Sequence, residues 1–120
     1  MPQIILEHSS NIKNIDYARF FSEIYCVVKQ LPNIGTCKIR ALSQDNYFIG
    51  SENGENAFAH LKVFMMPREE RTILLRENLA EALVLVVKSC LNPAIKANQL
   101  KCYPTVEVGL LSEHYYWVED

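Results

Sequence analysis

The sequence lacks the glycine-rich and serine-centred motifs that mark several large enzyme classes. Its four glycines form no G-x-G-x-x-G or G-x-x-x-x-G-K pattern, and neither G-x-S-x-G nor H-E-x-x-H occurs. These absences exclude the dinucleotide-binding fingerprint, the P-loop, the hydrolase nucleophile elbow and the helical zinc-protease site. Any chemistry must therefore come from other groups.

Cysteines and histidines are few and scattered. The cysteines form no C-x-x-C pair, and the cysteines and histidines together show no spacing that is typical of a zinc site. The residues are Cys26, Cys37, Cys90, Cys102, His8, His60 and His114. We interpret the cysteines as small, reduced core residues, and we expect no metal site.

Long apolar runs and clusters of charge are missing as well. No uninterrupted apolar run approaches the roughly 18 residues of a membrane span. The 12 lysines and arginines are spread along a chain of net charge −2, so we expect neither nucleic acid nor membrane as a partner. The opening segment has no secretory-signal pattern, which predicts a cytoplasmic protein. With 120 residues, the chain fits a single domain, 1–120.

Apolar spacing predicts the same order of elements in each half. In the first half we expect a strand at 2–8, a helix at about 15–31 capped by Asn14 or Asp16, and a strand at 36–42. The polar stretch that follows could hold a short strand at 46–49. In the second half we expect a strand at 57–66, a helix at about 69–91 stopped by Asn92 and Pro93, and a strand at 102–110.

The two halves match when one is shifted onto the other. A constant shift carries Tyr17 onto Leu75 and Phe21 onto Leu79, which indicates an internal duplication of about 2–56 and 57–120. The predicted fold class is α+β, with two consecutive βαβ units that form a four-stranded sheet covered by both helices on one face. We expect the other face to be apolar and bare, and therefore predict a homo-oligomer.

A proline at the second position is a candidate general base. Removal of Met1 would leave Pro2 with a free secondary amine. The pKa of an unperturbed α-amine is about 7.7–8, and an apolar pocket with neighbouring cations would lower this pKa further. A base is most effective when its pKa lies near the ambient pH.

Arg40 and Arg71 are candidate anion-binding residues. A guanidinium stays charged and matches a carboxylate or a developing enolate oxygen. Arginines at such positions are more often solvated surface groups or exposed ion-pair partners. His60, on a strand face, is likewise more often a hydrogen-bonded structural residue, and the aromatic tail "HYYWVED" is expected to pack against a subunit.

With these features in place, the sequence resembles the 5-carboxymethyl-2-hydroxymuconate isomerase family of the tautomerase superfamily, which includes 4-oxalocrotonate tautomerase and macrophage migration inhibitory factor. "MPQIILEHSSNI" is similar to the family's opening, Ile39 and Arg40 to its first-half arginine, and "AFAHLKV" to its central strand. "RTILLRENLAEAL" is similar to the segment with one arginine before the second helix and another in its first turns, here Arg71 and Arg76.

The resemblance implies a tautomerase fold, a homotrimer, a dicarboxylate substrate and no cofactor. It also implies that Pro2 moves a proton next to a conjugated carbonyl while Arg40 and Arg71 hold carboxylates and stabilise the dienolate oxygen. Two alternatives stay open. One is a non-catalytic trimer that binds a partner through residues 43–56 or the aromatic tail, and the other is a tautomerase acting on a different enol acid.

Overall fold

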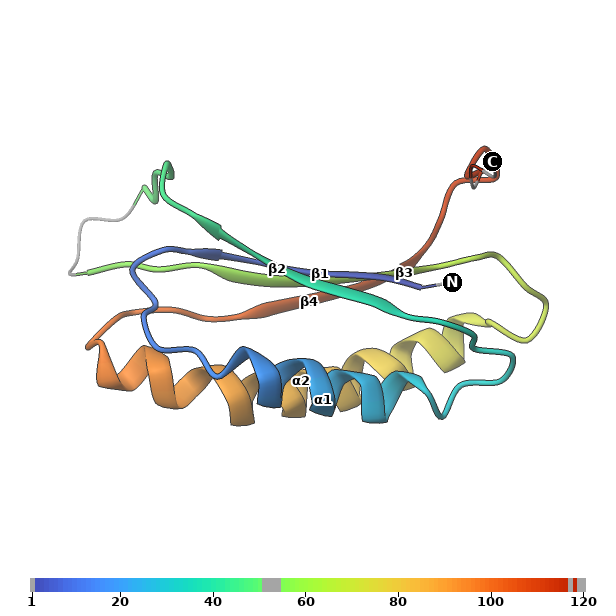
Figure 1. Ribbon diagram of the computed structural model, residues 1–120, viewed down its shortest axis with the longest axis horizontal. Coiled ribbons are helices and arrows are strands. Elements are labelled where there is room, and N and C mark those ends of the chain that lie inside the picture. Colours follow the sequence, from blue (N-terminus) through green and yellow to red (C-terminus); the bar gives the residue numbers. More distant parts are fainter. Residues whose placement is uncertain (1, 51–54, 117, 119–120) are drawn as a thin grey trace.

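The computed structural model describes residues 2–50, 55–116 and 118 and contains one sheet and two helices. The elements are β1 (Gln3–Ser9), α1 (Tyr17–Val28), β2 (Lys38–Gln44), β3 (Ala59–Met65), α2 (Ile73–Ala97) and β4 (Thr105–Leu110). The sheet order is β2-β1-β3-β4, with a central antiparallel pair between two parallel pairs. Both helices cover the same face (Figure 1). The predicted α+β fold of two βαβ units is confirmed.

The core lies between the helices and the inner face of the sheet. Alternation along β1 turns Ile4 and Leu6 toward the helices, and the antiparallel register places them opposite Val63 and Leu61 of β3. All four side chains are fully buried. They pack beneath α1, whose Phe20 and other buried residues form the apolar stripe that the sequence predicted.

The start of α1 is fixed by Asp16, one of the two predicted caps. Its carboxylate accepts the backbone N–H of Arg19 at 3.1 Å and so satisfies one of the free donors of the first turn. The other predicted cap, Asn14, lies outside the helix in the left-handed backbone region with φ 64°. The helix therefore begins at Tyr17 because of a local hydrogen bond.

The prediction that Asn92 and Pro93 end the second helix is wrong, since α2 continues to Ala97. Proline removes one helical hydrogen bond and crowds the preceding turn. Beyond it, however, Ala94 and Ile95 are buried against the sheet, so ending the helix would expose apolar area. By length and composition α2 resembles a membrane span, yet its buried stripe makes it a core helix of this domain.

Two predicted strands also differ from the structure. Residues 46–49 form no strand, because the chain bends at Asp45 and Asn46 after β2 ends. The last strand begins at Thr105 instead of 102, because Pro104 has no N–H for the sheet. Upstream of it, Lys101 forms only an isolated parallel bridge with Asn56.

The outer face of the sheet carries charged side chains beside the apolar Ile5, Leu42 and Phe64, which corrects the prediction of an apolar face. Lys62 lies 3.5 Å from the carboxylate of Glu7, and His60 contacts Glu107 at 3.1 Å. Arg40 projects from the same face. Strict alternation in β1 and β3 carries these charges outward while their neighbours fill the core.

We expect Tyr17→Phe to lower the free energy of unfolding by about 1–2 kcal/mol. The buried His8 ring donates from Nδ1 to the carbonyl of Ser9 at 2.8 Å, so its Nε2 accepts from the Tyr17 hydroxyl at 2.7 Å. Phenylalanine would leave this acceptor unpaired. Urea unfolding measures the loss, with Tyr25→Phe at a 45% exposed position as control. Equal stability of both variants would contradict the role of this bond.

We expect ionisation of the Cys90 thiol in the unfolded chain to lower the free energy of unfolding at alkaline pH. Burial, together with the contact of its thiol with Glu23 at 2.8 Å, raises the Cys90 pKa to about 12. In the unfolded chain the thiol ionises near pH 9, so stability is complete below that pH and falls as the pH rises toward 12. The slope is about 1.4 kcal/mol per pH unit. Cys90→Ala should remove this component in urea titrations at several pH values, whereas Cys26→Ala, at an exposed site, should retain it.

Candidate active site

Pro2 lies at the end of the two central strands. Its side chain is fully buried, and its carbonyl accepts the N–H of Lys38 at 3.2 Å. The register places the adjacent Gln3 opposite both Lys38 and Phe64, so Pro2 lies between the start of β2 and the end of β3. The N-terminus and the loops that lead into β2 and out of β3 share this end of the sheet (Figure 1).

Arg40 is the third residue of β2 and points to the outer face. Its Nη1 donates to Oε1 of Gln3 at 3.0 Å, and Nε2 of Gln3 donates to the Tyr115 hydroxyl at 3.0 Å. Within the described ranges, no carboxylate lies at ion-pair distance from Arg40. The guanidinium is thus oriented by a neutral partner and keeps its charge available for an anion.

Arg71 lies just before α2 and is only 3% exposed. Its Nη1 donates to the carbonyl of Met66 at 2.7 Å and its Nη2 to the carbonyl of Asn33 at 3.3 Å, while Nε has no partner among the described residues. Burial, followed by the nearby Arg68, lowers the Arg71 pKa. The side chain fastens the loop after α1 to the loop after β3, and it leaves one buried donor unused.

The three predicted site residues share one end of the sheet but not one face. Pro2 follows the inward alternation of β1, whereas Arg40 extends from the outer face. Arg71 is held between the two loops. No hydrogen bond joins Pro2 to either arginine within the described part of the chain. Their catalytic roles stay predictions.

The structure adds Gln3 and Tyr115 to this end of the sheet, and sequence reasoning missed both. The signal for Gln3 was present, because alternation in a strand that starts at the second residue puts Gln3 on the face opposite to the core. Tyr115 follows no periodic pattern, so its contact with Gln3 depends on the path of the tail. The other two aromatic residues of the predicted tail do not share this contact: the Tyr116 side chain is 78% exposed, and Trp117 lies outside the described residues.

His60 and Arg76 take no part in this cluster. Both ring nitrogens of His60 are bonded, Nδ1 to the Thr105 hydroxyl at 2.6 Å and Nε2 to Glu107 at 3.1 Å, near the start of β3. This agrees with the structural interpretation of His60. Arg76 donates from Nε to the carbonyl of Thr72 at 3.3 Å in the first turn of α2.

Comparison with known proteins identifies a family and its fold. The sequence model of the 5-carboxymethyl-2-hydroxymuconate isomerase family matches residues 2–118. No curated protein is similar enough in sequence to be matched. Three solved structures share the fold at sequence identities too low to show more than the fold.

The first is a 5-carboxymethyl-2-hydroxymuconate isomerase from Deinococcus radiodurans R1, with a TM-score of 0.79, 20% identity, and coverage of 99% of this chain and 89% of that one. The second is a 5-carboxymethyl-2-hydroxymuconate delta-isomerase, with a TM-score of 0.81, 16% identity, and coverage of 100% and 89%. The third is a macrophage migration inhibitory factor-like protein from Entamoeba histolytica, with a TM-score of 0.55, 11% identity, and coverage of 88% and 87%.

Proposed function

Because this chain belongs to the 5-carboxymethyl-2-hydroxymuconate isomerase family and is an isomerase, we propose that Pro2 is the general base for its reaction. The substrate is an unsaturated hydroxy or keto dicarboxylic acid of the 5-carboxymethyl-2-hydroxymuconate type. The observation that carries the proposal is the burial of Pro2 just before β1, at the end of the sheet that also holds Arg40 and Arg71.

The reaction needs only a proton carrier. After removal of Met1, the Pro2 nitrogen takes a proton from a carbon next to the conjugated carbonyl, and the electron pair moves into a dienolate. The protonated Pro2 amine then returns that proton to a different carbon of the dienolate, so the double bond has moved and no cofactor is consumed. Burial disfavours the charged amine and keeps part of it as free base near neutral pH.

The two arginines supply positive charge in different settings. Arg40 is exposed and has no acidic partner among the described residues, so it is suited to hold a substrate carboxylate. Arg71 is held in a dry setting, where its charge acts over a low dielectric and favours a growing negative charge on the dienolate oxygen. Such groups accelerate the reaction only as far as they bind the transition state better than the substrate.

We expect Arg40→Gln to lower kcat/KM by about 10²-fold, because a charge-assisted contact to a carboxylate is worth about 1.5–3 kcal/mol. A rise in KM should account for most of the loss. Steady-state kinetics on the purified enol substrate measure kcat and KM. The control is Lys29→Gln, which also removes one positive charge but lies at the C-cap of α1, remote from the site. Unchanged kinetics of Arg40→Gln would remove this residue from the site.

The substrate class is tested by following ultraviolet absorbance with a panel of enol acids, including a hydroxymuconate and phenylenolpyruvate. Intact-mass spectrometry first verifies that the chain starts at Pro2. We expect the fastest turnover with the dicarboxylate, since two carboxylates can use two cations. A preference for a monocarboxylate would support a tautomerase for a different enol acid, and no rate above buffer for any substrate would contradict the proposal.

We further propose a cytoplasmic homotrimer. The strands β2 and β4 end the sheet without a further partner in the described residues, and open edges favour pairing with another copy. Large apolar side chains are also exposed, among them Phe48 and Tyr103 at 93% and 82%. Sedimentation equilibrium should give three times the 13.8 kDa chain mass, and a monomer would contradict this assembly.

A further inference from the structure

A cavity lies away from Pro2, between the C-terminal half of α2 and the segment that leads into β4. Its volume is about 420 Å³, within the range of small-molecule sites. The segment enters β4 at Thr105, which pairs with His60, whereas Pro2 lies beyond the opposite end of the β1–β3 pair. The cavity is therefore separate from the proposed active site.

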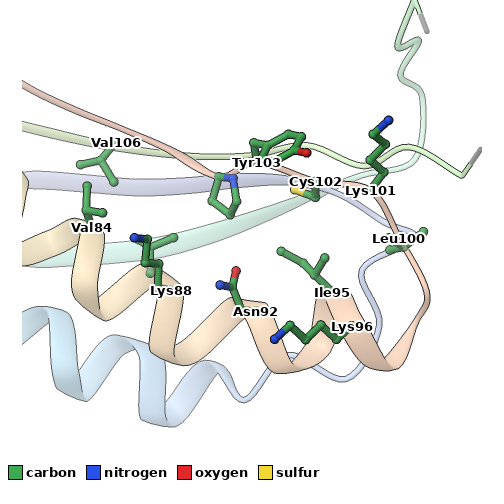
Figure 2. Close-up of a pocket in the computed structure, with 12 residues that line it drawn as sticks. Val84, Lys88, Asn92, Ile95, Lys96, Leu100, Lys101, Cys102, Tyr103 and Val106 are labelled. Atoms are coloured by element: carbon green, nitrogen blue, oxygen red, sulfur yellow. The ribbon is translucent and has the colours of Figure 1, made fainter. Parts of the chain in front are cut away.

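The walls of the cavity are apolar and one side of it is basic. The apolar lining comes from both elements and includes Val87, Ile95 and Val106, and the segment before β4 also contributes Lys101, Cys102 and Tyr103. On α2, the polar residues Lys88, Asn92 and Lys96 are spaced four residues apart and so follow one face of the helix. Figure 2 shows Asn92 directed from the helix toward the strand segment, with Lys96 extending along the helix toward it.

These cations are not neutralised locally. Among the residues that the structure describes, none that lines the cavity is acidic, and neither Lys88 nor Lys96 forms an ion pair. The two lysines are about 12 Å apart along the helix axis, with the Asn92 amide between them. The lining also contains no arginine, the residue whose planar fork best matches a phosphate.

We propose that this cavity binds an amphipathic carboxylate, with its apolar body against the Val87 and Val106 walls and its carboxylate at Asn92 between the two lysines. The apolar walls favour burial of an alkyl chain or an aromatic ring, and the basic side selects an anion over a neutral or cationic analogue. The proposal is independent of the isomerase reaction, since no residue of this cavity belongs to the Pro2 end.

The test is a calorimetric titration of the full chain with decanoate, for which we expect a Kd of about 0.1–1 mM. Lys88→Gln combined with Lys96→Gln should weaken binding about tenfold. Lys29→Gln is the control for loss of a positive charge, because Lys29 caps α1 and does not line the cavity, and it should change Kd less than about twofold. Decanol should bind more weakly than decanoate, and decylamine more weakly still.

Cys102 provides a second readout that does not depend on the lysines. Because it lines the cavity, decanoate should slow its alkylation by iodoacetamide, while the exposed Cys26 should react at an unchanged rate. Val84→Trp, a large side chain at the cavity wall, should abolish both binding and protection. Absence of binding, equal affinity for decanol, equal effects of the cavity-lysine variant and the Lys29 control, or unprotected Cys102 would each overturn the proposal.

Discussion

A variant that keeps residues in front of Pro2 is expected to lose about 10²–10⁴-fold in kcat, the usual contribution of a positioned acid–base group. Inserting glutamate between Met1 and Pro2 makes such a variant, because a large second residue prevents methionine removal. The Pro2 nitrogen then becomes an amide without a basic lone pair. Intact mass verifies the start of the chain, and the absorbance assay measures the rate.

The matching variant is Pro2→Ala, which keeps a free amine but loses the ring. We expect a smaller loss, about tenfold, since a primary amine retains basicity but has more rotational freedom to lose. Circular dichroism checks that both variants are folded. Full activity of the insertion variant would exclude Pro2 as the base, and equal losses in both variants would show that a free primary amine cannot replace the proline amine.

Replacing Arg71 by alanine is expected to lower both stability and activity. The carbonyls of Met66 and Asn33 lose their donor in a buried setting, and the gain from no longer burying a cation offsets part of that loss. We expect a net decrease of about 2 kcal/mol in the free energy of unfolding. Urea unfolding measures it, and Arg68→Ala, an exposed arginine in the same loop, should change stability by less than about 0.5 kcal/mol.

Activity separates a catalytic role of Arg71 from a purely structural one. Measured well below the unfolding midpoint, kcat/KM of Arg71→Ala should fall more than tenfold if its charge favours the dienolate. Arg71→Lys keeps the charge but not the fork, so it should regain part of the activity while gaining little stability. A folded Arg71→Ala protein with unchanged kcat/KM would leave Arg71 only the role of joining two loops.

The fold could be predicted from the sequence where a local pattern and the tertiary structure agree. The stripe in α1 and the Asp16 cap are local properties, and both are confirmed. Pro93 marks the limit of such reasoning, because the burial of Ala94 and Ile95 outweighs a local helix breaker and depends on the sheet beneath. The start of β4 was misjudged for the opposite reason, since the local breaker Pro104 does interrupt a run of suitable strand residues there.

The candidate site was less predictable, because its geometry depends on which face each side chain takes. The sequence named Arg40 and Arg71 from their residue type and order. It did not indicate that Arg71 donates to backbone carbonyls of two loops. Every residue has such a carbonyl, so the residue types do not show which ones accept a hydrogen bond. The charged side chains on the outer face could have been found by applying to all four strands the alternation already seen in residues 59–65.

The residue that precedes β3 limits how many reaction centres one chain can offer. Phe58 stands immediately before β3, as Pro2 stands immediately before β1. Its nitrogen, however, is a peptide N–H that donates to the Ser9 hydroxyl at 3.0 Å, and a peptide nitrogen cannot accept a proton at neutral pH. One chain therefore offers a single free amine at this end of its strands, so a three-chain particle would hold three reaction centres.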